Sequence, residues 1–200
     1  MTATEISARD RIVQSALDEI EKHGIVGLRV ADVAMGADVS VPLIYKYFRD
    51  RDGLLAEVLS GSIATFFMQD IQAMRILVES STGRLQVADL VALMPSPNEP
   101  RRIRNRRLRA MAIAASFDIP KLADALAINQ RLMNDATREL LELARKRTGS
   151  TSRVSLQAIT VLFQALAFGL VINDYETGQS ISLAEYHELL TELFDLFIFK

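Results

Sequence analysis

Residue types that commonly carry out catalysis are scarce in this chain of 200 residues. It contains no cysteine, which excludes disulfides, thiolate metal sites and cysteine nucleophiles. Its two histidines, His23 and His187, are too few for a multi-histidine metal centre. The sequence has no glycine-rich phosphate loop and no serine elbow, and its acidic residues fall on amphipathic surfaces. We therefore expect no enzyme, no catalytic residues, no metal and no cofactor.

A different kind of site is predicted between residues 24 and 55, where two short helices are joined by a tight turn. Ala34 is small enough for the helices to cross, and Asp38 tolerates the left-handed backbone of the turn. In the next helix Ile44 and Phe48 share one face, which can pack on the first two helices. The opposite arc carries Pro42, Leu43, Tyr45 and Lys46. Such an arc is what a recognition helix presents to the major groove of DNA.

The segment Arg11–Leu59 resembles the N-terminal domain of the TetR/AcrR family of transcriptional regulators. The matching motifs, at the family's spacing, are Gly24-Ile25-Val26-Gly27-Leu28, Val33-Ala34, Val39-Ser40, Ile44-Tyr45-Lys46-Tyr47-Phe48 and Leu54-Leu55. The resemblance implies a homodimeric repressor that binds a palindromic operator on double-stranded DNA. It also implies a C-terminal domain that dimerises through its last two helices and holds a cavity for a small-molecule effector.

The resemblance implies DNA contacts from residues around the second and third helices. The expected set is Arg29, Ser40, Val41, Pro42, Leu43, Tyr45, Lys46, Tyr47 and Arg51. Tyr45, Tyr47 and Arg51 would serve phosphates, which position a protein on DNA without reading its sequence. Val41 and Leu43 replace polar residues of the family, so thymine methyl groups are the contacts left to them. If Tyr45 and Tyr47 were only packing residues, the presence of Pro42, Lys46 and Arg51 at these positions would remain unexplained.

Two further residues qualify this picture. Lys46 occupies a position that varies in the family and could reach either a base or a phosphate. Arg29 stands where a serine or threonine usually caps the second helix, so a DNA phosphate could satisfy the amide left free. The first 56 residues hold seven basic and nine acidic side chains, which gives no basic domain. Because the basic residues bracket the recognition helix, a local positive face remains possible.

The whole chain has the apolar spacing of an all-α protein, and no run of alternating β-branched residues competes. We predict about nine helices: from a cap at Thr4 or Ser7 to Gly24, then near 30–37, 40–48, 50–79, 84–94, 101–116, 120–147, 155–174 and 183–199. Asp50 is the predicted N-cap of the fourth helix. The predicted domains are a three-helix DNA-binding domain over residues 1–53 and a helical ligand-binding and dimerisation domain over residues 54–200.

Bulky, soft side chains in the second domain suggest where an apolar or amphipathic effector would bind. The candidate residues are Phe66, Phe67, Met74, Met111, Met133 and Phe163. The fourth helix runs from the DNA-binding end to this region. We therefore expect a ligand beside it to tilt the helix, change the spacing of the two recognition helices and release DNA.

Residues 154–173 contain no charge over a length that could span a bilayer. Polar residues such as Gln157, Thr160 and Gln164 favour a buried or dimer-interface helix instead. We expect a cytoplasmic protein without a membrane partner, dimerising through residues 155–174 and 183–199. Two different functions remain open, a helical interaction module without DNA binding and a membrane-attached helical protein.

Six arginines fall between Arg101 and Arg109. They surround the helix, so Arg104 and Arg107 lie on the arc shared by Met111 and Ala114 and need carboxylate partners, unless the segment is only a solvated helix end. In the family this helix lies near the DNA-binding domain, where Asp18, Glu19 and Glu21 could supply those carboxylates. The arginines could also bind an anionic ligand or make a second contact with DNA.

Overall fold

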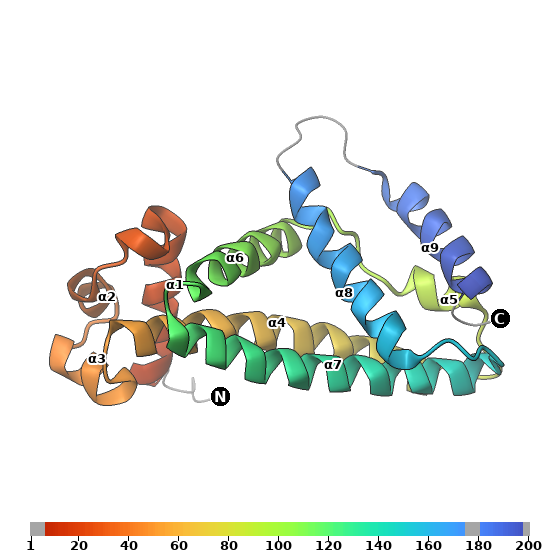
Figure 1. Ribbon diagram of the computed structural model, residues 1–200, viewed down its shortest axis with the longest axis horizontal. Coiled ribbons are helices and arrows are strands. Elements are labelled where there is room, and N and C mark those ends of the chain that lie inside the picture. Colours follow the sequence, from red (N-terminus) through yellow and green to blue (C-terminus); the bar gives the residue numbers. More distant parts are fainter. Residues whose placement is uncertain (1–6, 175–180, 198–200) are drawn as a thin grey trace, which may run out of the picture. The chain divides into compact units, whose positions relative to one another are not determined.

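The computed structural model describes residues 7–174 and 181–197, and every regular element in those ranges is a helix (Figure 1). In chain order the helices are α1 (Ala8–Gly27), α2 (Val30–Gly36), α3 (Val41–Phe48), α4 (Arg51–Ser80), α5 (Val87–Ala92), α6 (Pro100–Ser116), α7 (Pro120–Thr148), α8 (Leu156–Asn173) and α9 (Leu183–Phe197). The described ranges thus confirm the all-α prediction and its nine helices. The possible cap at Thr4 and the predicted helix end at Phe199 lie outside the described residues.

The chain divides into two compact units. Unit 1 comprises Met1–Ala64 and Leu108–Asn129, and unit 2 comprises Thr65–Arg107 and Gln130–Lys200. Helices α4, α6 and α7 therefore each contribute residues to both units. Unit 1 extends beyond the predicted DNA-binding domain of residues 1–53, because the first turns of α4 and residues 108–129 group with it.

Local signals in the sequence set the boundaries of the first helices. The hydroxyl of Ser7 accepts a hydrogen bond from the Asp10 amide at 3.2 Å and caps α1. Gly24 interrupts the helix with φ 70° and ψ 173°, and one more turn follows it. Asp38 adopts φ 52° in the turn between α2 and α3, as predicted. Pro42 lies in the first turn of α3, where its missing N–H has no partner to lose.

The core of unit 1 joins the three short helices to the start of α4. Its fully buried members include Ile12 of α1, Val33 of α2, Ile44 of α3 and Leu54 of α4. Helices α1 and α2 approach so closely that a Cβ at Gly36 would lie 2.4 Å from the Ser15 hydroxyl. That hydroxyl donates to the Val33 carbonyl at 3.0 Å, which satisfies a buried polar group at the crossing. The packing fixes how α3 is presented.

The core of unit 2 is built from α4, α5, α7, α8 and α9. Its buried members are Ile71, Val78, Leu85, Val87, Leu90, Val91, Ala136, Leu140, Leu141, Ala144, Ile159, Leu190 and Phe194. Helix α5 is shorter than the predicted 84–94. It begins after Gln86, whose amide donates to the Asp89 carboxylate at 2.8 Å in a capping box. Arg84 instead donates from Nε to the Thr148 carbonyl at 2.7 Å, at the end of α7.

Candidate nucleic-acid interface

Helix α3 has the two faces that the sequence predicts. Ile44 is fully buried and Phe48 is 3% exposed, so this face packs on the rest of unit 1. Tyr45 is 43% exposed and Tyr47 is 45% exposed. The other exposed candidates on or beside α3 are Ser40, Pro42 and Lys46, and the half-buried ones are Val41 and Leu43. The polar arc of α3 is therefore open to a partner.

The start of α2 lacks a side-chain cap, as expected from Arg29. Arg29 occupies the N-cap position with an extended backbone, and its side chain makes no capping hydrogen bond. The side chain is exposed. The backbone amides of Asp32 and Val33 both donate to the Arg29 carbonyl at 3.1 Å. The guanidinium is thus not used to build the helix terminus.

Arg51 makes contacts that its sequence position does not reveal. Its Nη2 donates to the Ile25 carbonyl at 2.6 Å and, more weakly, to the Val26 carbonyl at 3.4 Å. Its Nε donates to the Leu28 carbonyl at 3.2 Å. Ile25 and Val26 lie in the last turn of α1, after the interruption at Gly24, and Leu28 follows the helix. The half-buried guanidinium therefore ties the first residue of α4 to the segment that leads into α2.

Asp50 begins α4 as the sequence predicts, but a distant lysine joins it. Its Oδ1 accepts from the Gly53 amide at 2.7 Å, and its Oδ2 pairs with Lys121 of α7. The Lys121 hydrogen bond, followed by that of the Gly53 amide, lowers the pKa of Asp50 below its ordinary value. A Cβ at position 53 would lie 2.1 Å from the Phe48 carbonyl, so this turn requires glycine.

Lys121 and the hollow beside it are the features that sequence reasoning missed. The hollow is an open groove of about 420 Å³ within unit 1, formed by the end of α3, the first turns of α4 and the first turns of α7. Tyr47, Arg49 and Lys121 are among its lining residues. Arg49 has φ 69°, a second left-handed residue that the sequence does not announce. Because Lys121 lies 71 residues from Asp50, no local pattern could have paired them.

The candidate effector residues are not all brought together. Phe67, Met74 and Phe163 pack against the core of unit 2, where the Phe163 ring meets that of Phe194 edge-on at 4.9 Å. Met133 is also in unit 2 and is only 3% exposed, whereas Met111 belongs to unit 1 and is 37% exposed.

Phe66 has a different environment from the other candidates. It lies under two arginine side chains, with the Arg101 guanidinium 4.6 Å and that of Arg102 5.7 Å from its ring centroid. Five of the six candidates therefore belong to unit 2, and Met111 belongs to unit 1.

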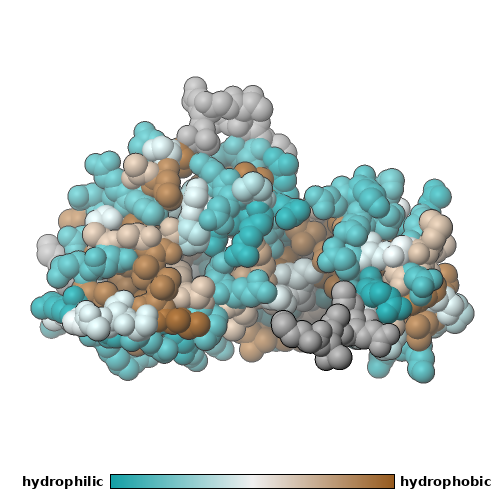
Figure 2. Space-filling view, turned by 180° about the vertical axis from the view of Figure 1, so that it is seen from behind, coloured by the Kyte–Doolittle hydropathy of each residue, from teal (hydrophilic) through white to brown (hydrophobic). Residues whose placement is uncertain are grey.

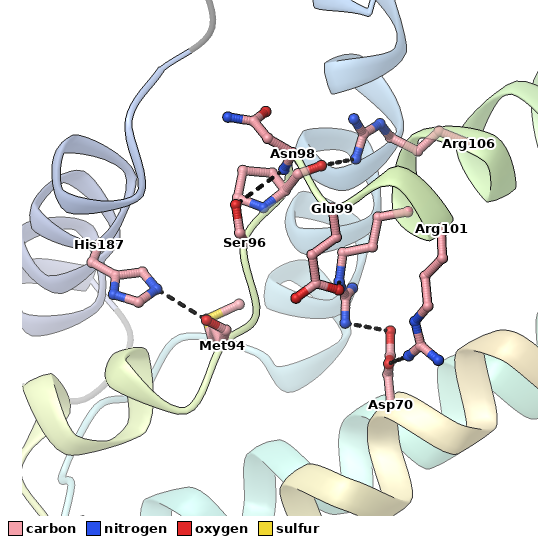
Figure 3. A network of polar contacts seen from close by, with 10 residues as sticks. Asp70, Met94, Ser96, Asn98, Glu99, Arg101, Arg106 and His187 are labelled. Carbon is pink, nitrogen blue, oxygen red and sulfur yellow. Dashed lines mark hydrogen bonds and ion pairs between the residues drawn. The ribbon is translucent and has the colours of Figure 1, made fainter.

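Three arginines of α6 pair with carboxylates from within unit 2, and Figure 3 shows one of these carboxylates, Asp70, beside Arg101. Arg101 and Arg102 both pair with Asp70 of α4, at 2.9 and 2.8 Å. Arg106 forms a bidentate pair with Asp174 at the end of α8, with Nε 3.0 Å from Oδ2. The side chains of Arg106 and Asp174 are only 12% and 5% exposed.

The expected partners of Arg104 and Arg107 are Asp18, Glu19 or Glu21 of α1; in the structure Arg107 donates from Nη2 to the backbone carbonyl of Asp174 at 2.9 Å. On α1, Glu19 pairs with Lys22 instead, and Asp18 accepts from Gln14. The actual partners, Asp70 and Asp174, stand far from the arginines in the sequence, so the arginine pattern alone could not identify them.

Helix α8, expected to be either buried or at a dimer interface, is largely exposed within the protomer. It is one of two described helices long and apolar enough to cross a membrane, the other being α4. In the most apolar stretch of each helix, 17% is buried in α8 and 44% in α4. Its exposed apolar side chains are Val161, Leu162, Leu166 and Ile172. Its polar residue Thr160 is fully buried, and Gln164 is half-buried against Gln130 and Asn134 of α7. Helix α8 is therefore apolar on two sides, with Ile159 and Phe163 at the core of unit 2 and Val161, Leu162, Leu166 and Ile172 exposed.

On the face drawn in Figure 2, hydrophobic residues gather in patches between hydrophilic ones. Among the residues that the structure describes, no group of three or more acidic, histidine or cysteine side chains could hold a metal ion.

Comparison with known proteins identifies the N-terminal segment. Residues 12–58 match the family model described as "Bacterial regulatory proteins, tetR family". Over 56 residues the chain is 34% identical to the helix-turn-helix regulator YttP of Bacillus subtilis (strain 168). That alignment spans 28% of this chain and 27% of YttP, so it concerns the segment around the helix-turn-helix.

Solved structures extend the similarity to the whole fold. A protein described as a TetR-family transcriptional regulator from Rhodococcus sp. is 23% identical with a TM-score of 0.68, over 96% of this chain and 98% of that one. A regulator from Saccharomonospora viridis, solved in complex with choline, is 19% identical with a TM-score of 0.69, over 96% and 98% of the two chains. The chain thus shares the all-helical fold of these regulators.

Proposed function

We propose that this chain, a TetR-family transcriptional regulator, acts as a homodimeric repressor that binds a palindromic operator and is released by a small effector. The observation that carries the proposal is the open arc of α3, where Tyr45, Lys46 and Tyr47 stand exposed opposite a buried apolar face. A helix with these two faces is suited to the major groove, because its packed side holds the polar side in place.

On this proposal eight of the nine predicted DNA-contact residues touch DNA. Tyr45, Tyr47, Ser40 and Arg29 hold phosphates, while Lys46 reaches a base or a phosphate. The aliphatic surface of Val41, Pro42 and Leu43 offers contacts to thymine methyl groups. We assign Arg51 a positioning role, since its Nε and Nη2 already donate to the carbonyls of Leu28 and Ile25.

Dimerisation through α8 and α9 would cover the large apolar side chains that these helices expose. A monomer would leave Val161, at 57% exposure, and Ile172, at 73%, in water while polar Thr160 is buried. Helix α9 adds Leu189 and Leu196, which are 58% and 55% exposed. A second copy of the same surface would cover these residues in a two-fold arrangement.

The effector is proposed to bind in unit 2 beside Phe67, Met74 and Phe163, which flank its core. Because α4 supplies residues to both units, a ligand that prefers one position of this helix would change the presentation of α3. Binding of choline by one structural relative supports a small molecule in this fold. The protein would work in the cytoplasm, where its operator is.

The proposal is tested by a gel-shift titration of the full chain against the DNA upstream of its own gene. We expect a single complex with two protomers per duplex, weakened by Tyr45→Phe and Tyr47→Phe, which remove only the hydroxyls. A panel of small molecules is then screened for thermal stabilisation, and each stabilising compound is added to the complex. Stabilising compounds that leave the complex intact, together with a Phe67→Ala variant that changes neither readout, would overturn the effector part.

A further inference from the structure

Lys121 places a cation from α7 at the junction of the recognition helix and α4. Its ammonium pairs with Asp50, the residue that separates Arg49 from Arg51. Lys121 also lines the open groove of unit 1 together with Tyr47 and Arg49. Tyr47 belongs to the arc already proposed to touch DNA, so the groove is continuous with that surface. Lys121, Asp50, Tyr47 and Arg49 all belong to unit 1.

The charges around the groove suit a polyanion only because of this lysine. Asp50 must accept the Gly53 amide to cap α4, and its lowered pKa keeps it ionised. A bare carboxylate at this point would repel a phosphate. The other acid of the groove, Glu57, already pairs with Arg9. With both acids compensated, the exposed guanidinium of Arg49 leaves a net positive charge on the groove.

The pair is also poorly explained as a stabilising contact. Lys121 is 53% and Asp50 is 50% exposed, and ion pairs at such exposure contribute little to folding. A lysine ammonium has three N–H donors, of which Asp50 takes one. The remaining donors face water in the open groove or, in a complex, an anion there.

We propose that Lys121 is a DNA contact: the phosphate backbone that passes Tyr47 continues over the groove and is held there by Lys121 and Arg49. The inference rests on the proposed DNA-binding function and extends the interface from the helix-turn-helix to α7. Lys121 compensates the Asp50 cap and donates to a phosphate at the same time. Its partner is DNA of any sequence, since a phosphate contact positions the protein without reading bases.

The test is the salt dependence of operator binding by Lys121→Ala. Each phosphate contact contributes about 0.9 to the slope of log K against log salt, so a dimer that loses two should lose about 1.8. The matched control is Lys146→Ala on the same helix, since Lys146 also pairs with a carboxylate, Glu142, at a surface position but in unit 2. We expect the control to keep the wild-type slope. Circular dichroism melting of each variant checks that it is folded.

The double variant Asp50→Asn/Lys121→Ala distinguishes a phosphate contact made by Lys121 from mere neutralisation of the Asp50 charge. If Lys121 touches phosphate, the double variant keeps the reduced slope relative to Asp50→Asn alone. A double variant whose slope equals that of Asp50→Asn would show that Lys121 only neutralises Asp50, and the contact would be refuted. Wild-type slope in Lys121→Ala, with normal wild-type binding, refutes this inference alone. Absence of operator binding by the wild type refutes the proposed function and the inference with it.

Discussion

Replacing Arg51 by alanine should destabilise unit 1 without removing a phosphate contact. Two hydrogen bonds, of 2.6 and 3.2 Å, run from its guanidinium to the carbonyls of Ile25 and Leu28. Hydrogen bonds from a charged donor contribute about 1.5 kcal/mol each at the low end, which suits a half-buried group. Losing both costs about 3 kcal/mol, and a chain of this size then melts about 6–12 °C lower.

Lys46→Ala is the matched variant, because Lys46 is exposed on the face opposite the core. We expect an unchanged melting temperature, weaker operator binding and, if Lys46 holds a phosphate rather than a base, a salt slope reduced by about 1.8 for the dimer. Arg51→Ala should instead show a lower melting temperature with the wild-type slope and weaker operator binding. Arg51→Lys should be destabilised as well, since an ammonium cannot reproduce the fork that reaches two carbonyls. The assignment fails if Arg51→Ala keeps the wild-type melting temperature and reduces the slope of log K against log salt.

Three further changes have definite expected outcomes. Leu166→Asp on α8, at a side chain 45% exposed, should give monomers in sedimentation. The control Leu132→Asp on α7, at a side chain 57% exposed, should stay dimeric. A Leu166→Asp variant that stays dimeric would count against the α8 interface. Arg106→Ala should cost about 3–5 kcal/mol by leaving Asp174 buried without its partner, as measured by denaturant unfolding. Arg101→Ala, at a side chain 50% exposed, should cost less than about 1 kcal/mol, and equal losses for the two variants would contradict this assignment. Because the pKa of Asp50 is lowered in the fold from 3.8, its ionised form stabilises the protein above about pH 3.8, and this stabilisation is lost as pH falls through the folded pKa. The difference in melting temperature between wild type and Asp50→Asn should therefore be constant near neutral pH and change only in acid. A change between pH 6 and 8 would show that another group causes the pH dependence.

The features that could be predicted from the sequence are those set by nearby residues. Ser7, Asp38 and Asp50 act within three residues of their own positions, through caps and a left-handed turn, and each lies where the pattern placed it. The two faces of α3 follow from helical periodicity in the same way. The family resemblance rested on this segment, and residues 12–58 match the family model.

The features that could not be predicted depend on residues far apart in the chain. Arg51 meets carbonyls more than 20 positions away, and Lys121 meets Asp50 across 71 positions. For the arginines of α6 the sequence shows only that carboxylates are needed, and the fold supplies Asp70 and Asp174. Single-sequence patterns carry no information on such pairs, because periodicity reports which way a side chain faces along its own helix.

Selection of bound duplexes from a random DNA library by the full-length wild-type chain tests the central claim most directly. The exposed arc of α3, presented twice by a two-fold dimer, should enrich a palindrome whose half-sites lie about one helical turn apart. Sedimentation of the selected complex should give two protomers per duplex for a single dimer. Enrichment of no sequence over random DNA, or of a lone half-site bound by one protomer, would contradict the account.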